Sequence, residues 1–144
     1  MRLTSFTDFA LRALMRLAGE PARSFATPEI AAEFGISRNH LAKVVRDLAE
    51  SGFIATQRGA GGGFTLARPP SSITLGEVVR ALEGEALVEC FRDDGGHCVL
   101  TPRCRLKAKL AAAREAFMRE LDATTLAECA YPARSKPSPA RGTA

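Results

Sequence analysis

The chain has 144 residues, of which 46% are hydrophobic and 25% are charged, and its net charge is +4. This length suits one domain with an appendage, and the near-average composition excludes collagen-like and wholly disordered chains. No stretch of about 18 apolar residues predicts a membrane span, and Asp8, Arg12 and Arg16 interrupt the apolar stretch that a signal peptide requires. We therefore expect a cytoplasmic protein with no membrane partner.

Charge divides the chain into three parts. Residues 1–73 carry nine Lys or Arg and six Asp or Glu, and residues 74–130 carry eight and ten. Residues 131–144 carry three basic side chains, no acidic one and three prolines, a composition typical of a disordered tail. The net charge of +3 on the first part permits nucleic-acid binding but does not establish it.

Helical signals open the first part. Ser5, with Asp8 three residues later, resembles a capping box and predicts a helix that continues at helical spacing to Gly19. Thr27 and Pro28 predict the N-cap and the first residue of a second, shorter helix.

The second and third predicted helices are separated by a tight turn. Gly35 ends the second helix, and Ser37 predicts the N-cap of a third helix that continues to Gly52. Apolar spacing lets the third helix pack across the second and point its N-terminal end outward. The inward-facing residues are Ile30, Phe34, Ile36, Leu41, Val44, Val45 and Leu48.

Two short strands follow. Residues 53–58 and 64–68 have the pattern of strands, and the glycine-rich segment 59–63 forms the turn between them. A winged helix-turn-helix domain has this order of elements: two short helices that meet at a tight turn, followed by a hairpin with glycines at its tip. A three-helix bundle with an unrelated hairpin is the alternative, but the turn, caps and hairpin together favour DNA binding.

The polar residues at the start of the third helix are candidates for DNA contact. Arginine reads guanine and asparagine reads adenine through paired hydrogen bonds, whereas serine and lysine hold phosphates. Glycines at the tip of the hairpin let the backbone approach DNA, and Arg58 and Arg68 flank them. The alternative is an ordinary solvent-exposed helix face. The candidate DNA-binding residues are Ser37, Arg38, Asn39, His40, Lys43, Arg58, Gly62 and Gly63.

Neither a nucleotide-binding loop nor an enzyme active site is indicated. Gly59 and Gly61 begin a glycine pattern, but Phe64 stands where the third glycine belongs, and no Gly-Lys-Ser/Thr follows. The two histidines, His40 and His97, lie in no nucleophile or metal-hydrolase motif. We predict that the protein is not an enzyme.

The second part is helical at both ends. Thr74 with Glu77 forms a capping box that predicts a helix to about Leu82, residues 84–100 are irregular, and Thr-Pro at 101–102 predicts the start of a long helix. The predicted fold is mainly α with a small β-hairpin wing, a winged helix-turn-helix followed by a long C-terminal helix. The apolar stripe of that helix comprises Leu106, Leu110, Ala113, Phe117 and Leu121.

Three of the four cysteines lie close together. Cys90, Cys98 and Cys104 lie within one polar, glycine-rich segment of 15 residues, and Cys129 lies outside it. In a cytoplasmic protein this clustering favours metal or redox chemistry over disulfides. Structural zinc normally uses closer cysteine pairs and a fourth ligand, here only His97, whereas an iron–sulfur cluster tolerates wider spacing. A thiol switch without metal is the third alternative.

These motifs together resemble the NsrR subfamily of the bacterial winged-helix iron–sulfur regulators, a family that also includes IscR. The likeness covers about residues 1–130 and is specific only as a combination. It rests on residues 2–14, residues 35–41 (Gly-Ile-Ser-Arg-Asn-His-Leu), Arg58-Gly59-x-x-Gly62-Gly63 and the three clustered cysteines.

The resemblance implies a homodimer whose long C-terminal helices pair and whose recognition helices bind a palindromic double-stranded DNA operator. It implies a 4Fe–4S cluster, with 2Fe–2S as the alternative, on Cys90, Cys98 and Cys104, and a fourth ligand, Asp8, from the other subunit. The alternative role of Asp8 is that of an acid in the first turn of a helix, and the two roles either coexist or exclude each other. The implied function is a repressor that senses nitric oxide: loss of the bond to Asp8, and then of the cluster, would shift the recognition helices and release the DNA.

Two features depart from the subfamily. The seven residues between Cys90 and Cys98 exceed the expected spacing, so the resemblance does not predict the geometry of this loop. Lys107 stands where IscR-like members place a ligating histidine, which argues against that ligand set. A related iron–sulfur or redox-sensing regulator and a zinc-stabilised DNA-binding protein are the alternative functions.

Overall fold

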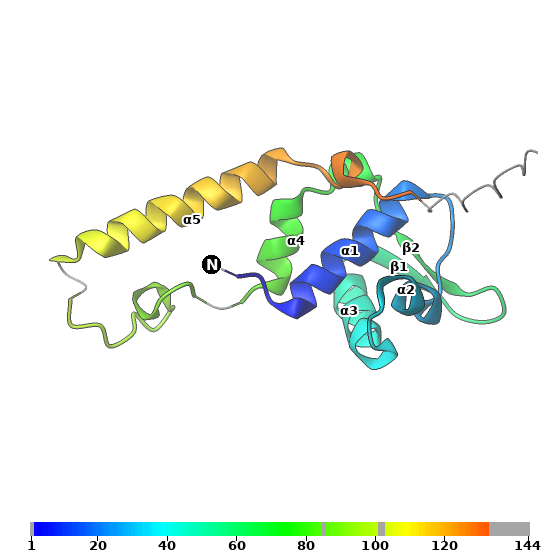
Figure 1. The fold of residues 1–144 in the computed structure, drawn as a ribbon, viewed down its shortest axis with the longest axis horizontal. Helices are drawn as coiled ribbons and strands as arrows, with labels where there is room; N and C mark the ends of the chain where they lie inside the picture. Colours follow the sequence, from blue (N-terminus) through cyan, green and yellow to red (C-terminus); the bar gives the residue numbers. More distant parts are fainter. Residues whose placement is uncertain (1, 85, 101–102, 133–144) are drawn as a thin grey trace, which may run out of the picture.

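The computed structural model of the protein describes residues 2–84, 86–100 and 103–132. It is mainly helical with one antiparallel hairpin (Figure 1), which confirms the predicted fold class. Within these ranges, no helix is long and apolar enough to cross a bilayer. The elements are α1 (Ser5–Gly19), α2 (Thr27–Phe34), α3 (Arg38–Glu50), β1 (Ile54–Gln57), β2 (Gly63–Leu66), the short 3₁₀ helix η1 (Pro70–Ser72), α4 (Leu75–Leu82), η2 (Glu89–Phe91), α5 (Arg105–Ala123) and η4 (Leu126–Cys129).

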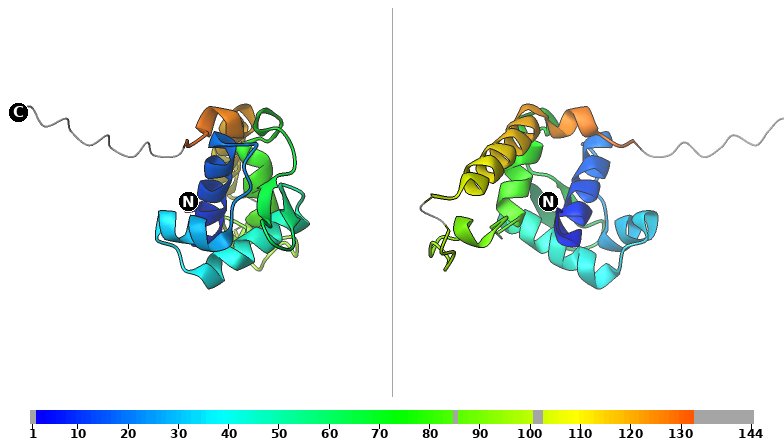
Figure 2. Two further views of the ribbon diagram at one scale, coloured as in Figure 1. Left: turned by 90° about the vertical axis from the view of Figure 1, so that its right-hand side faces the viewer. Right: turned by 60° about the vertical axis from the view of Figure 1, so that its left-hand side comes forward.

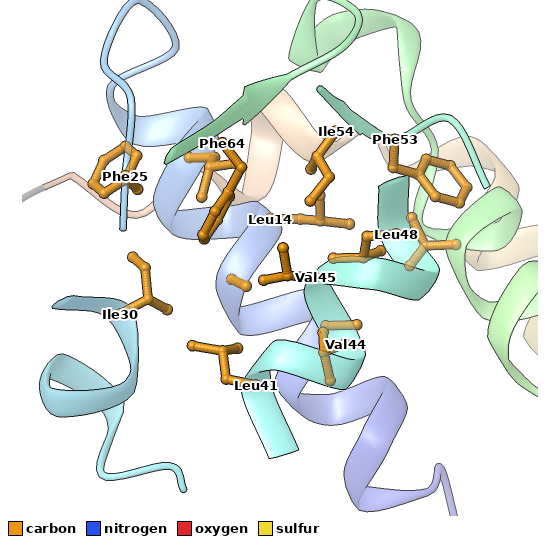
Figure 3. Close-up of a cluster of buried hydrophobic side chains, with 14 of the residues drawn as sticks. Leu14, Phe25, Ile30, Leu41, Val44, Val45, Leu48, Phe53, Ile54 and Phe64 are labelled. Atoms are coloured by element: carbon orange, nitrogen blue, oxygen red, sulfur yellow. The ribbon is translucent and has the colours of Figure 1, made fainter. Parts of the chain in front are cut away.

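The core of the winged-helix part lies between α1, α3 and the hairpin. β1 and β2 pair with Ile54 opposite Leu66. Figure 3 shows Leu14 of α1 close to Val45 of α3, with Ile54 and Phe64 of the strands above them. Each of these buried side chains stabilises the fold by about 2 kcal/mol relative to exposure, so the hairpin and α3 form one unit with α1. The fully buried apolar residues include Leu14, Phe25, Ile30, Leu41, Val44, Leu48, Ile73 and Val78.

Thr4, rather than Ser5, caps α1. The backbone of Thr4 is extended (φ −63°, ψ 154°), and its hydroxyl accepts a hydrogen bond from the backbone N–H of Thr7 at 3.2 Å. The predicted cap at Ser5 is therefore wrong by one residue, because the hydroxyl that meets a free N–H is that of Thr4. Asp8 does not complete a capping box and instead pairs with Arg12.

The start of α2 also differs from the prediction by one residue. Thr27 is already helical, and the N-cap is Ala26, which makes no side-chain cap hydrogen bond. The cause is the preceding residue: Phe25 forms an isolated β-bridge with Phe64, with N–O distances of 3.0 and 2.8 Å, which holds the chain extended up to Ala26. α2 ends as predicted at Gly35, whose φ of 64° lies in the left-handed region.

A buried arginine joins α1 to α2. Arg16 is 2% exposed, and its Nε lies 3.0 Å from both carboxylate oxygens of Glu33. Its Nη2 lies 2.8 Å from Glu20, and its guanidinium stacks 4.7 Å above the centre of the Phe25 ring. Nη1 has no partner among the described residues. These contacts fix α2 relative to α1 although α2 itself has only eight residues.

α4 is tied at both ends. The predicted capping box is confirmed: the Thr74 hydroxyl accepts from the Glu77 N–H at 3.2 Å, and the Glu77 carboxylate accepts from the Thr74 N–H at 2.8 Å. At the other end, the Glu83 carboxylate accepts from the N–H and the hydroxyl of Thr4 at 2.7 and 2.9 Å. Burial acts to raise the pKa of Glu83, but hydrogen bonds from Thr7 and Thr4 outweigh it, so the pKa is lowered.

α5 begins later than predicted. Its first helical residue is Arg105 and its N-cap is Cys104. The N–H of Arg103 donates to the carbonyl of Leu100 at 3.2 Å, a turn that precedes the helix. Residues 101–102, on which the predicted start depends, lie outside the described residues.

α5 is held mainly at its C-terminal end. Arg80 of α4 binds both carboxylate oxygens of Asp122, and the Leu75 N–H donates to the Thr124 carbonyl at 3.0 Å. Along its described length, α5 has no buried residue. In Figures 1 and 2 its N-terminal end projects away from the winged-helix part. The helix therefore depends on α4 for its position.

After α5 the chain returns to the winged-helix part. The Tyr131 N–H donates to the Met15 carbonyl at 2.8 Å, and the ring centroids of Tyr131 and Phe34 are 6.2 Å apart. Gly19 leaves no room for a side chain, because a Cβ there would meet the Tyr131 carbonyl. The first residue of the predicted disordered tail is thus fixed against α1 and α2, and residues 133–144 lie outside the described residues.

Candidate functional site

The five candidate residues on α3 and at its cap share one exposed face. Leu41, Val44 and Leu48 on the opposite face are at most 1% exposed. Among the described residues, the ion pair on α3 joins Arg46 to Asp47 at 3.5 Å, and no acidic side chain pairs with the cations of the exposed face. Those cations are therefore available to phosphates or base edges. The exposed residues are Ser37, Arg38, Asn39, His40 and Lys43.

The turn between α2 and α3 sets the direction of this face. The Ile36 N–H donates to the Ala31 carbonyl at 2.9 Å, and the Ile36 side chain is 8% exposed. Ile36 thus holds the turn against the core, while Ser37, the next residue, is exposed and occupies the predicted N-cap position of α3. The Ser37 side chain makes no cap hydrogen bond, so its hydroxyl is free for an outside partner.

The tip of the hairpin is exposed, and the backbone geometry of the hairpin itself requires its glycines. Gly59 and Gly61 have φ of 102° and 76°, in the left-handed region. A Cβ at Gly62 would lie 2.5 Å from the Gln57 carbonyl oxygen, and one at Gly63 would meet the Phe25 carbonyl. Close packing within the hairpin thus accounts for Gly62 and Gly63, and their contact with DNA stays a prediction.

Arg58 and Arg68, which flank the tip in the sequence, have different surroundings. Arg58 is exposed, and no acidic residue in the described ranges pairs with it. Arg68 turns back to the base of the hairpin, where it donates to the Ser72 carbonyl at 3.0 Å and lies 3.5 Å from Glu77. Arg68 therefore supports the start of α4, and Arg58 is the cation that remains beside the wing.

The three clustered cysteines lie on one loop but do not form a closed site. Cys90 is in η2, Cys98 is in the following loop and Cys104 is the N-cap of α5. All three are half-buried free thiols. In the part of the chain that the structure describes, no three His, Cys, Asp or Glu side chains are arranged to hold a metal ion. The donors fit an iron–sulfur cluster in kind, although the three thiols are not gathered into one site in the described residues.

Glu89 and Gly96, which belong to none of the sequence motifs, close this loop. The Glu89 carboxylate accepts a hydrogen bond from the backbone N–H of His97 at 3.0 Å. A Cβ at Gly96 would lie 2.5 Å from the Glu89 carbonyl oxygen. Asp-Gly-Gly at 94–96 is a turn signal that could have indicated the reversal, but nothing in the spacing identifies Glu89.

Asp8 lies apart from the cysteines in sequence and is available on the surface. It is in the first turn of α1, its side chain is 45% exposed, and its carboxylate lies 2.7 Å from the guanidinium of Arg12. No described cysteine, histidine or acid forms a metal-binding group with it. Its predicted role as a ligand therefore concerns another copy of the chain.

Comparisons with known proteins agree with this geometry. The model of the Rrf2 family, described as iron-dependent transcriptional regulator, matches residues 3–131. The chain is 48% identical over 130 residues to the HTH-type transcriptional regulator NsrR of Geobacillus kaustophilus. The aligned residues cover 89% of this chain and 88% of that protein. This relative confirms the resemblance to the NsrR subfamily.

Solved structures show the same fold. CymR, the global cysteine regulator of B. subtilis, superposes with a TM-score of 0.74 at 27% identity over 90% of this chain and 96% of its own. IscR of T. potens superposes with a TM-score of 0.70 at 25% identity over 89% and 85%. The prediction that the protein is not an enzyme is confirmed because the family and the relative are transcriptional regulators. The chain therefore belongs to the Rrf2 family of winged-helix transcriptional regulators.

Proposed function

We propose that the protein is a homodimeric repressor that binds a palindromic operator and senses nitric oxide through an iron–sulfur cluster. Residues 1–73 form its DNA-binding domain, residues 74–130 bind the cluster and pair the subunits, and residues 131–144 form a tail. The observation that carries the proposal is the presence on one chain of an exposed cationic recognition face and a separate loop with three free thiols.

DNA recognition is assigned to α3 and the wing. Arg38 and Asn39 reach base edges, Ser37, His40 and Lys43 contact the backbone, and Arg58 with the wing tip contacts the adjacent phosphates. Two recognition helices of a symmetric dimer then meet half-sites about 34–36 Å apart. A small change in their separation lowers affinity for both half-sites at once.

Dimerisation is assigned to α5 and the groove beside it. The apolar side chain of Leu106 is 63% exposed, and Leu110, Phe117 and Leu121 are only half-buried. A cavity of about 560 Å³ between the N-terminal segment, α4 and α5 is lined in part by Leu3, Val79, Phe117 and Met118. A second copy of α5 would cover the exposed leucines and the apolar part of this groove. Glu83, Ala86 and Arg114 line both this groove and a second hollow beside residues 91–94, so the loop that follows Cys90 adjoins the groove.

The cluster is assigned to Cys90, Cys98 and Cys104, with the partner subunit's Asp8 as the fourth ligand. A bound 4Fe–4S cluster, or the 2Fe–2S alternative, would supply iron that reacts with nitric oxide. A carboxylate is a weaker partner for iron than a thiolate, so Asp8 would be the ligand most easily displaced from a bound cluster. Arg12, one helical turn away, is placed to bind the released carboxylate. Thr4, the cap of α1, is hydrogen-bonded to Glu83 at the end of α4, so the helix that carries Asp8 is connected to the segment that leads to the cysteines.

Anaerobic isolation tests the proposal. Protein purified without oxygen should contain iron and sulfide and should retard a palindromic promoter fragment until nitric oxide is added. Stoichiometric zinc without iron would refute sensing and favour the zinc-stabilised alternative, with DNA binding intact. Release of DNA on cluster loss but not on exposure to nitric oxide would identify a related iron–sulfur regulator instead.

A further inference from the structure

The residues next to Cys90 and Cys98 are held together by contacts that neither cysteine makes. The Glu89 carboxylate accepts from the His97 N–H at 3.0 Å, which joins the neighbour of one cysteine to the neighbour of the other. On the same side, the Cα of Gly96 packs so tightly on the Glu89 carbonyl that a Cβ would lie 2.5 Å from its oxygen.

The segment between them reverses direction by its own contacts. The Gly95 N–H donates to the Arg92 carbonyl at 2.9 Å, and the Gly96 N–H donates to the Asp94 carboxylate at 3.0 Å. Gly95 and Gly96 have φ of 75° and 57°, which side chains other than glycine rarely adopt. The seven residues between Cys90 and Cys98 therefore form a closed turn, and the contacts of Glu89, the first residue of η2, hold the two ends of this turn together.

We propose that Glu89 and Gly96 hold Cys90 and Cys98 close together in the metal-free chain, as a preformed two-thiol half-site to which Cys104 is added when metal binds. Bringing two thiols together across a flexible loop costs conformational entropy. Because the closed turn already orders this loop, less entropy is lost when metal binds. The nature of the metal centre rests on the proposed function. The closure itself is a property of the metal-free chain and is tested without metal.

The test measures how readily the two thiols meet. In the full chain with Cys104→Ser and Cys129→Ser, Cys90 and Cys98 are the remaining thiols. Diamide oxidises them to one intramolecular disulfide: the S–S bond forms as both S–H bonds break, and two protons and two electrons pass to diamide, which becomes the hydrazine. The rate, followed by mass spectrometry, reports the effective concentration of one thiol at the other.

Matched variants separate closure from general loop effects. Glu89→Ala removes the acceptor, and Gly96→Ala introduces both strain and the clash with Glu89, so each should slow disulfide formation about tenfold. Glu89→Gln keeps an acceptor oxygen and should restore most of the rate. Gly95→Ala has the same backbone strain but open space around its Cβ, so it should slow the reaction less than Gly96→Ala does, and the difference between the two measures the clash with Glu89. Asp93→Asn removes a charge from the same loop and should stay near the parent rate. Equal rates for Glu89→Ala, Asp93→Asn and the parent would overturn the proposal.

Iron content gives a second, independent measurement. After anaerobic reconstitution of the chain with all four cysteines, Glu89→Ala should retain less iron and sulfide than Asp93→Asn. If the parent chain takes up no iron while the disulfide rates still differ as stated, the proposed function fails and the preformed half-site stands. If the parent takes up iron and Glu89→Ala matches it in both measurements, the half-site is refuted and the proposed function stands.

Discussion

Asp8 and Arg12 form an ion pair one turn apart on α1, with the guanidinium 2.7 Å from the carboxylate and both side chains nearly half exposed. Such a pair stabilises a helix by only about 0.3–0.5 kcal/mol. A stronger ligand site can therefore take the Asp8 carboxylate from Arg12 at little energetic cost. The pair makes Asp8 available without leaving it disordered.

Asp8→Ala should change the absorption spectrum of the cluster-loaded protein, because an oxygen ligand to iron is lost. Arg12→Gln should leave the spectrum unaltered, since it removes only the competing cation. The spectra of both variants, recorded anaerobically at equal iron content, decide the role of Asp8. Identical spectra for Asp8→Ala and the parent chain would make Asp8 only a first-turn acid.

Arg38→Ala and Lys43→Ala should weaken DNA binding in different ways. Loss of a base contact at Arg38 should cost about 1–3 kcal/mol on the operator and little on unrelated DNA. Loss of a phosphate contact at Lys43 should weaken binding to the operator and to unrelated DNA alike. It should also reduce the slope of log affinity against log salt concentration by about one per subunit. Titrations of operator and scrambled DNA at several salt concentrations measure both effects. Arg46→Gln, whose arginine pairs with Asp47, is the control that should match the parent.

Arg16→Ala should destabilise the fold by about 2–4 kcal/mol, because it leaves Glu33 without its cation and removes a buried side chain from the Phe25 ring. Arg16→Met fills the space without the charge and should recover part of that loss. Urea denaturation gives the free energies of unfolding. Arg23→Ala removes an exposed arginine that also lies over Phe25 and should have a much smaller effect; equal losses for the two alanine variants would contradict the assigned role of burial.

The attachment of α5 should weaken in acid. The hydrogen bond from Arg80 lowers the pKa of Asp122 below its ordinary value of 3.8. A carboxylate with a lowered pKa stabilises the fold fully above its ordinary pKa, and this contribution is lost as pH falls through the lowered value. The Leu75 amide donates to Thr124 at the end of α5, and the Leu126 amide of η4 donates to Ile73 just before α4. The protection factors of both amides against hydrogen exchange should therefore decrease as the pH falls through the lowered value. Asp122→Asn should exchange faster at neutral pH and lose this acid dependence; unchanged exchange would show that the backbone contacts suffice.

Much of the fold follows from local signals in the sequence. Gly35 ends α2 in the left-handed conformation, and Thr74 with Glu77 caps α4, as predicted. The caps of α1 and α2 are each displaced by one residue because distant partners decide them. Thr4 is held by Glu83, and Phe25 is held by Phe64. A contact across 79 residues leaves no periodic signal in the chain.

The candidate sites were predictable to different extents. The exposed face of α3 follows from helical periodicity, since burying Leu41 and Val44 directs Arg38 and Lys43 to solvent. The destination of Arg68 does not follow, because its long side chain turns back to Ser72 rather than along the wing. The closure of the cysteine loop by Glu89 also escapes prediction, since side chains in irregular segments are placed by individual contacts rather than by a repeat.

The one-sided attachment of α5 has a mechanical consequence. A helix of 19 residues is about 28 Å long, and it is fixed near Asp122 while Cys104 stands at its other end. A tilt of about 10° at the fixed end corresponds to about 5 Å of travel at Cys104 for a rigid rod of this length. Conversely, a displacement of Cys104 would turn α5 about its attachment near Asp122, so the length of this helix would convert a change at the thiol into a rotation at α4.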